Sequence, residues 1–282
     1  MNQKMKNAGI CCMVAGFCAG TAAAPAAEGG PAPIIAKRVS IFVLTGQSNS
    51  LGTTADPNEK DRSPGEDPLD AKIPFYWSNR STRAGDGPSV LYDDSAGRIV
   101  NLRAQKGEGA DPQFWGPEFG FGRQLAAEGK SDILIVKASR GGGGNGFWLK
   151  GSPDDQMYRH VVKTVQEAVA ALPKGTDFEF AALLYVQGES DSADEAKASG
   201  ERLRLLVRNL QKDLPRAGKM KVLIGGIAAE GLNRDIVRAK QAERYVTVKG
   251  VAEQEAKANL AIWPLRVIAA DDDLATANTH LQ

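Results

Sequence analysis

Residues 39–50 read VSIFVLTGQSNS, an apolar run that stops abruptly at a set of polar side chains. The seven residues before Gly46 are mostly apolar and do not alternate strictly with polar ones, which predicts a strand covered on both faces. The polar end, Gln47-Ser48-Asn49, has two interpretations. It is either a turn that only ends the strand or a serine nucleophile presented beyond it.

Four further apolar runs follow at wide intervals, and helical patterns separate most of them. The runs lie at residues 133–138, 180–186, 222–228 and 265–270, and the helical patterns at 117–128, 158–172, 193–214 and 233–249. Strands that alternate with helices predict a three-layer α/β/α sandwich around a five-stranded parallel sheet. Ligands of such sheets bind beyond the carboxyl ends of the strands.

Residues 53–111 differ from the rest of the chain. They are rich in Pro, Gly, Asp, Asn and Arg and contain no long periodic segment. A loop of this length is unusual and is often functional when it is ordered. We expect an insertion over the mouth of the site.

The first residues have the pattern of a secretory signal segment. Lys4 and Lys6 precede a short apolar stretch at 10–21, and small residues follow it. This pattern predicts a signal peptide at residues 1–27, too short to span a bilayer, and therefore an exported protein that is free of the membrane after cleavage. The alternative is a tail that contains a chance apolar run.

All three cysteines, Cys11, Cys12 and Cys18, lie in the predicted signal segment. A Pro/Gly/Ala-rich linker is predicted at residues 28–37, and the folded domain at 38–282. Without the signal segment, the chain has no disulfide, no thiol nucleophile and no thiolate metal site. The formal net charge of +1 gives no overall field that would attract nucleic acid or an anionic membrane.

Polar residues occur where four of the predicted strands end. They are GQSN at 46–49, SRGGGGNG at 139–146, QGESD at 187–191, and DDD at 271–273 followed by NTH at 278–280. The carboxyl ends of parallel strands meet at one edge of a sheet. The sequence therefore predicts an active site at that edge.

A serine nucleophile needs a base, which is usually a histidine. The chain has two histidines, His160 and His280. His160 lies within a predicted helix and is expected to be a packing or helix-surface residue. His280 follows the last predicted strand, so Ser48 and His280 form the expected catalytic pair. The alternative for Ser48 is a helix N-cap.

Acyl transfer also needs hydrogen-bond donors for the developing oxyanion. The candidates are the Ser48 N–H, an N–H of the glycine run 141–144, and the side-chain amide of Gln187. The glycine run is equally well explained as a flexible turn. Its spacing also satisfies G-x-G-x-x-G, but Phe147 and Trp148 follow and no helix begins there, so we reject a dinucleotide site.

Three groups of acidic residues are open to more than one interpretation. Glu189 and Asp191 form a metal pair, an acid/base pair or, as we favour, a pair that orders its loop through hydrogen bonds. A metal site would be poorly supplied with ligands, because the chain has two histidines and no thiol outside the signal segment. Asp271–Asp273 also fit a solvated turn.

Five motifs occur in an order that resembles a known family. GQSN (46–49), GPEFGFG (116–122), KASRGG (137–142), YVQGESD (185–191) and a late histidine resemble the sialate O-acetylesterase / carbohydrate esterase family 6 branch of the SGNH hydrolases. The resemblance extends from about residue 40 to the C-terminus. It implies a flavodoxin-like domain, an acetylated carbohydrate as substrate, serine-dependent removal of its acetyl groups, and no metal or organic cofactor.

By position, the resemblance assigns Ser48 as nucleophile and His280 as general base. The backbone of Ser48, Gly141 and Gly142 corresponds to the oxyanion hole, together with Gln187. Substrate contacts are expected from the two residues that flank Ser48 and from two tryptophans that could stack on a sugar ring: Gln47, Asn49, Trp115 and Trp148. Each tryptophan is otherwise a core residue.

The chain departs from the family pattern at two places. The family has an aspartate three residues before the catalytic histidine, where this chain has Ala277. Glu189, Asp272 or Asp273 takes that supporting role, or the site works as a dyad. The chain ends at Gln282, so we expect a domain that is short at its C-terminus. A glycan-binding protein on a decayed esterase scaffold is the alternative function. The sequence leaves the sugar, the ester position and the oligomeric state undefined.

Overall fold

The computed structural model describes residues 32–52, 64–81, 90–92, 97–106, 112–153, 155–227, 230–242, 246–248 and 267–269. The predicted signal peptide at 1–27 lies outside these residues, as do three predicted site residues, Asp272, Asp273 and His280. Within the described part, no helix is long and apolar enough to cross a membrane.

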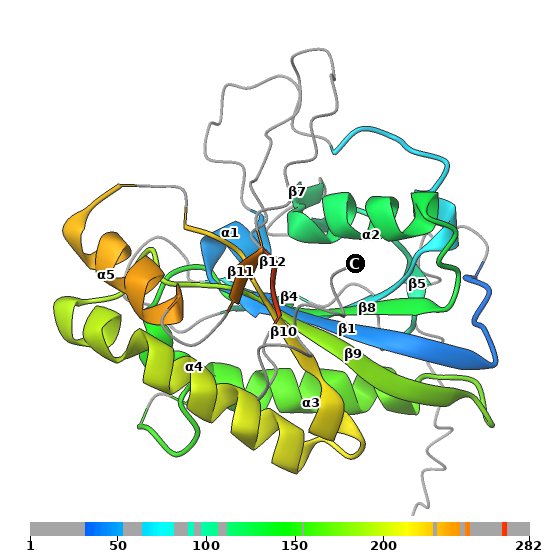
Figure 1. Ribbon diagram of the computed structural model, residues 1–282. Coiled ribbons are helices and arrows are strands. Elements are labelled where there is room, and N and C mark those ends of the chain that lie inside the picture. Colours follow the sequence, from blue (N-terminus) through cyan, green and yellow to red (C-terminus); the bar gives the residue numbers. More distant parts are fainter. Residues whose placement is uncertain are drawn as a thin grey trace, which may run out of the picture.

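A six-stranded sheet forms the centre of the described structure (Figure 1), with the order β10-β9-β1-β8-β2-β5. Its strands are β1 (Arg38–Gly46), β2 (Pro74–Trp77), β5 (Val100–Asn101), β8 (Ile133–Ser139), β9 (Asp177–Val186) and β10 (Lys221–Ile224). β1 lies between β8 and β9 and is parallel to both. Gly46, the last residue of β1, pairs with Ser139 and with Val186, so these three strands end at the same level.

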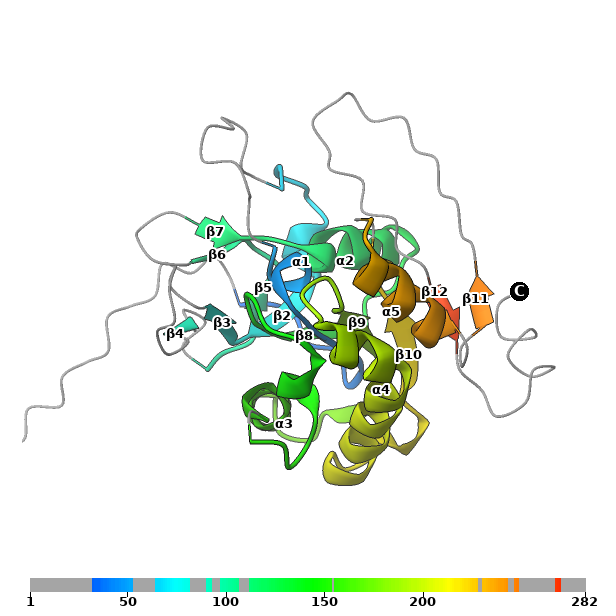
Figure 2. The ribbon, with the colours of Figure 1, turned by 90° about the vertical axis from the view of Figure 1, so that its left-hand side faces the viewer.

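Helices cover both faces of the sheet. α3 (Gln156–Ala170) and α4 (Ala193–Asp213) lie on one face, and α2 (Pro117–Ala127) lies on the other (Figure 1). α1 (Ser48–Leu51) and α5 (Leu232–Ala242) lie beyond the carboxyl ends of the strands, on the side that faces the viewer in Figure 2. The predicted α/β class and its layers are confirmed.

Shorter elements complete the described structure. They are two antiparallel pairs, β3 (Asn79–Ser81) with β4 (Val90–Tyr92) and β6 (Gln105–Lys106) with β7 (Pro112–Phe114), and three 3₁₀ turns, η1 (Asp70–Lys72), η2 (Asn145–Trp148) and η3 (Ala217–Lys219).

The near-continuous apolar run of β1 serves two cores. Ile41 and Val43 are buried in the core under α3 and α4, whereas Leu44 is buried in a cluster on the opposite face. Successive strand residues point to opposite faces, so a strand covered on both sides needs apolar residues at consecutive positions. The opening run of the sequence is therefore a strand because of its composition and is central because it has no polar face.

The predicted five-stranded parallel sheet is wrong in its membership. β2 and β5 belong to the sheet, and β5 is antiparallel to β2. Both come from the interval 53–111, where PFYW (74–77) is too short to stand out from its Pro-rich surroundings. The run at 265–270 contributes β12 (Val267–Ala269), which pairs with β11 (Val246–Val248) in a separate two-stranded sheet.

The predicted helix at 233–249 is also too long. α5 ends at Ala242, and residues 246–248 form β11 instead. Val246, Thr247 and Val248 are β-branched, and such residues favour a strand when a partner strand is available. Tertiary pairing thus overrides the helical pattern at this point.

The sequences of α3 and α4 contain two features that favour a helix, a buried apolar stripe and a capped first turn. Val161 and Val165 of α3 lie one turn apart and are buried against the sheet. α4 begins with a capping box, in which the Ser192 hydroxyl accepts from the Glu195 N–H and the Glu195 carboxylate accepts from the Ser192 N–H. A capping box satisfies two donors that the first turn would otherwise leave without partners.

His160 is a buried packing residue on α3. Its Nε2 lies 2.8 Å from the Ser78 carbonyl oxygen and therefore carries the proton that is donated there. Burial lowers the pKa of His160 to about 4, against the opposing effect of the Ser78 hydrogen bond. The unfolded chain binds a proton at this residue between about pH 6.5 and pH 4, whereas the folded chain does not.

We therefore predict that acid destabilises the fold through His160. The free energy of unfolding should fall by about 3 kcal/mol between pH 7 and pH 4 because of this residue alone. In His160→Gln, which keeps a donor for Ser78 but does not titrate, that part of the loss should disappear. Urea unfolding at both pH values measures it. An equal loss in the two proteins would contradict the assignment.

Candidate active site

The end of β1 and the end of β9 approach each other very closely. Gly46 has φ of +150°, and a Cβ placed on it would lie 1.9 Å from the Val186 carbonyl oxygen. That oxygen accepts a hydrogen bond of 3.0 Å from the Gln47 N–H. Only glycine fits such an approach. The turn after β1 is therefore fixed at the point where the polar residues begin.

Ser48 is the first residue of α1, a single turn that follows at once. Gln47 occupies the N-cap position, and its carbonyl oxygen accepts from the N–H groups of Ser50 and Leu51. The N-cap interpretation of Ser48 is therefore wrong. Ser48 is partly exposed, and within the described residues no side chain or backbone group hydrogen-bonds its hydroxyl. This hydroxyl is available for chemistry.

The loop after β9, residues 187–191, is tied to the turn after β1. The Gln47 side-chain oxygen accepts from the Ser190 N–H at 3.2 Å, and Asn49 Nδ2 donates to Glu189 Oε1 at 2.5 Å. The structure thus brings together Gln47, Ser48, Asn49 and Glu189, as the sequence predicts. Gln47 is buried and serves this loop contact.

The second oxygen of the Glu189 carboxylate is the unusual atom of the site. Oε2 is shielded from solvent and has no hydrogen-bond partner among the described residues. A buried carboxylate oxygen without a donor is unfavourable. The carboxylate contacts Asn49, the residue next to Ser48, so Oε2 is an acceptor without a donor among the described residues close to the turn that carries Ser48.

The glycine-rich loop after β8 lies next to the turn after β1. The Arg140 N–H donates to the Gly46 carbonyl oxygen, and the Gly141 N–H donates to the Arg80 carbonyl oxygen, both at 3.0 Å. The predicted oxyanion role of Gly141 is therefore wrong for its N–H. Gly142 has φ of +67°, and its N–H has no acceptor in the described part of the chain. Gly142 remains a candidate donor.

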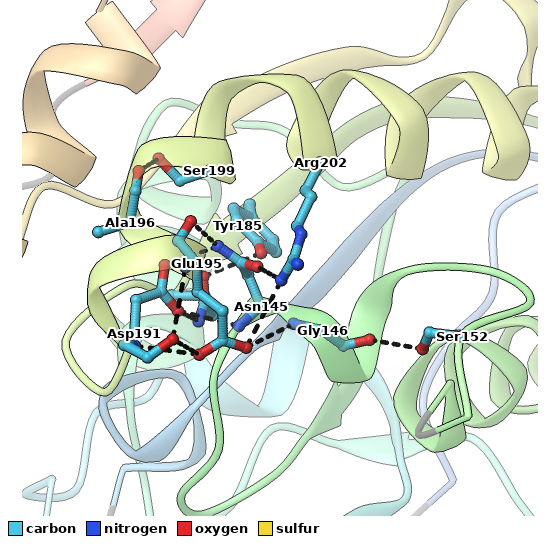
Figure 3. A network of polar contacts seen from close by, with 11 residues as sticks. Asn145, Gly146, Ser152, Tyr185, Asp191, Glu195, Ala196, Ser199 and Arg202 are labelled. Atoms are coloured by element: carbon cyan, nitrogen blue, oxygen red, sulfur yellow. Dashed lines mark hydrogen bonds and ion pairs between the residues drawn. The ribbon is translucent and has the colours of Figure 1, made fainter.

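Asp191 is joined to Asn145, the residue that follows the glycine run, through a buried network (Figure 3). Asp191 Oδ1 accepts from the Asn145 N–H at 2.9 Å and from Gln187 Nε2 at 2.6 Å. Oδ2 accepts from Asn145 Nδ2 at 2.7 Å, and Arg202 donates to the Asn145 side-chain oxygen at 2.5 Å. Asn145 was not among the predicted residues, although its place in the polar run after β8 could have indicated it.

Gln187 is not an oxyanion donor in this arrangement. Its amide nitrogen is bonded to Asp191, and its amide oxygen accepts from the Tyr185 hydroxyl at 3.1 Å. The side chain is buried. The predicted role fails because the Gln187 amide N–H is already used by Asp191, a residue of the same loop.

The favoured interpretation of Asp191, that it orders its loop, agrees with these contacts. Burial raises the pKa of Asp191, while the hydrogen bonds from Gln187 and Asn145 oppose that rise. Both of its oxygens are occupied. No group of three or more potential metal ligands occurs in the described ranges. The Asp191 contacts are those of a structural carboxylate.

The two tryptophans predicted at the site have different environments. Trp148 is 1% exposed, lies in the core and donates from Nε1 to the Thr45 hydroxyl at 2.9 Å. It is therefore a core residue and offers no face to a sugar. Trp115 is partly exposed, and its backbone N–H donates to the Gly52 carbonyl oxygen at 3.1 Å, next to the end of α1.

Comparison with known proteins gives a family and a fold. The model of a family described as "Carbohydrate esterase, sialic acid-specific acetylesterase" matches residues 38–281. A solved structure of a protein from Arabidopsis thaliana is 24% identical, with a TM-score of 0.50, and the match covers 73% of this chain and 80% of that one. No curated protein matches the chain.

Two further solved structures are similar at lower scores. NanS is 19% identical, with a TM-score of 0.43, over 66% of this chain and 65% of that one. A carbohydrate acetylesterase from Xanthomonas citri is 15% identical, with a TM-score of 0.41, over 72% of this chain and 47% of that one.

The family match contains the central strands, α1, and the loops after β8 and β9. It includes every site residue described above, so the geometry and the match concern the same part of the chain. The chain therefore belongs to the carbohydrate esterase, sialic acid-specific acetylesterase family, and it is a carbohydrate O-acetylesterase, a carboxylic ester hydrolase.

Proposed function

We propose that Ser48 is the nucleophile and His280 the general base of an exported enzyme that removes O-acetyl groups from carbohydrate. The observation that carries the proposal is the position of Ser48. It starts a one-turn helix at the carboxyl end of the central strand, between two polar loops, with a hydroxyl that no described residue engages. Substrates of the sialate or acetylxylan type fit this proposal.

The reaction follows from these groups. Ser48 Oγ attacks the acetyl carbonyl carbon while His280 takes the hydroxyl proton. The tetrahedral intermediate collapses, the sugar oxygen leaves with that proton, and the acetyl group stays on Ser48. A water molecule, deprotonated by His280, then attacks the acyl-enzyme. The second tetrahedral intermediate collapses, Ser48 Oγ takes the proton back from His280, and the product leaves as acetic acid and ionises to acetate.

Backbone N–H groups stabilise the oxyanion of each intermediate. The Ser48 N–H belongs to the first turn of α1 and has no acceptor among the described residues, as is usual at a helix start. The Gly142 N–H is the second candidate. Fixed backbone donors suit this purpose because they need no reorganisation during the reaction.

Glu189 is the described acid best suited to support His280. Its Oε2 atom is shielded and has no donor in the described part of the chain, and an imidazole N–H would supply one. A carboxylate in that role orients the ring and stabilises the imidazolium that forms. Asp272 and Asp273 are the competing candidates, because Ala277 stands where the family has an aspartate.

Export is proposed from the sequence of residues 1–27. The basic start, the short apolar core and the small residues after it form the pattern of a cleaved signal. Cleavage can be read directly from the N-terminal residue of the protein recovered outside the cytoplasm.

Ser48→Ala should abolish ester hydrolysis. The variant loses the only atom that forms the acyl-enzyme, so kcat for a small acetyl ester and for acetylated sugars should fall by about 10³-fold or more. Acetate release by purified protein measures it. Full activity in the variant would refute the mechanism. Glycan binding without acetate release in either protein would favour the binding-protein alternative.

Glu189→Gln should lower kcat by about a hundredfold or more, with a smaller effect on KM, because the imidazolium loses its partner charge. Removal of a nearby negative charge lowers the pKa of the imidazolium, so the acidic limb of the kcat/KM profile should move to lower pH. Asp272→Asn and Asp273→Asn are the matched variants. If one of them reproduces these effects and Glu189→Gln does not, Glu189 is not the supporting acid.

A further inference from the structure

A buried ion pair lies at the end of α1, the turn that begins with Ser48. Lys137 of β8 and Glu118 of α2 are both 0% exposed, and Lys137 Nζ is 2.8 Å from Glu118 Oε1. Both residues belong to motifs that carry the family resemblance, KASRGG and GPEFGFG, but no step of the proposed reaction uses either one. A fully buried ion pair is costly to desolvate and is weak support for stability by itself.

The Lys137 ammonium has three N–H groups and three acceptors. They are Glu118 Oε1 at 2.8 Å, Gln105 Oε1 at 2.8 Å and the Leu51 carbonyl oxygen at 2.9 Å. Burial lowers the pKa of Lys137, and the Glu118 carboxylate opposes that effect. Three acceptors around one nitrogen match the protonated form, because a neutral amine has only two donors.

The acceptors are themselves held in place. Glu118 Oε1 also accepts from the Gly116 N–H at 2.9 Å and from Gln105 Nε2 at 3.0 Å. The segment before Gly116 is packed against the end of α1, because a Cβ on Gly52 would lie 1.9 Å from the Trp115 carbonyl oxygen. The Lys137 ammonium therefore links β8 to the end of α1 through acceptors that are themselves held by hydrogen bonds and close packing.

α1 depends on such external contacts. It has four residues, and a single turn has no stability of its own in water. Its last carbonyl groups lack partners within the helix, and a cation at this end is favourable. Leu51 lies three residues after Ser48 and ends the same turn, so a contact at Leu51 acts on the turn that carries Ser48.

We propose that Lys137 is a positioning residue for Ser48, which acts through the Leu51 carbonyl oxygen, with Glu118 and Gln105 holding its ammonium. The inference rests on the proposed function of Ser48. Its distinguishing claim is kinetic: loss of the Lys137 contact should slow the attack by Ser48 without a matching change in substrate affinity.

The test compares two variants with the wild-type protein. Lys137→Met/Glu118→Gln removes both charges and the donor to Leu51. Val161→Ala is the control, because it removes buried methyl groups from the core under α3 and none of the contacts of Lys137. Three measurements are made on each protein. They are kcat and KM for an acetylated sugar, the rate of covalent labelling of Ser48 by a fluorophosphonate, and the free energy of unfolding in urea.

In the double variant, kcat and the labelling rate should fall by about tenfold to a hundredfold, because small misplacement of a nucleophile is costly. KM should stay within about threefold, and the Val161→Ala control should keep kcat and labelling within about threefold of wild type. Equal labelling rates in the double variant and the control would overturn the proposal and leave the pair a structural one. If the double variant does not fold, Lys137→Leu/Glu118→Leu, which replaces the pair by apolar side chains, should show the same fall in kcat at unchanged KM, and an unchanged kcat there would overturn the proposal.

Failure of the proposed function gives a different result. In that case the wild-type protein is not labelled at Ser48, whatever the variants do. Hydrogen exchange then tests the positioning claim without activity, because the N–H groups of Ser50, Leu51 and Gly52 form the hydrogen bonds of α1. Faster exchange of these amides in the double variant than in the control supports the claim, and equal exchange overturns it.

Discussion

The contact between Gly46 and Val186 is the constraint on which the site depends. A side chain at position 46 would collide with the Val186 carbonyl oxygen, so the ends of β1 and β9 can meet only at a glycine. The same Gly46 carbonyl oxygen accepts from the Arg140 N–H on the other side. One residue thus aligns three strands at their carboxyl ends, and the polar loops that follow them must share a small volume.

Two buried polar networks then hold what this alignment brings together. Asp191 fixes the glycine-rich loop and Gln187, and Lys137 fixes the end of α1. The Asp191 carboxylate and the Lys137 ammonium both have hydrogen-bond partners for their polar atoms, and these partners make the burial of each charge tolerable. Networks of this kind favour one arrangement of the backbone over its alternatives. An acyl-transfer enzyme that relies on backbone donors requires such rigidity.

Much of the fold follows from periodicity. The runs at 39–45, 133–138 and 180–186 become neighbouring strands, and the helices at 117–128, 158–172 and 193–214 lie within a few residues of their predicted limits. The errors fall where the pattern is short or ambiguous. PFYW at 74–77 joins the sheet by pairing with β8, and residues 246–248 leave a helical pattern to pair with β12. Strand pairing is a non-local contact, so a window of sequence does not contain it.

The sequence by itself determined that Gln47, Ser48, Asn49 and the 187–191 loop lie at one edge of a parallel sheet, because local composition indicates the strands and the polar residues that follow their carboxyl ends. Only the tertiary structure decided what each side chain does there. Gln187 bonds Asp191, Trp148 bonds Thr45 in the core, and Lys137, a charged residue inside an apolar strand, reaches the end of α1. The physical reason is that a polar group takes the partner that is nearest after folding, and those partners are 4, 103 and 86 residues away in the chain.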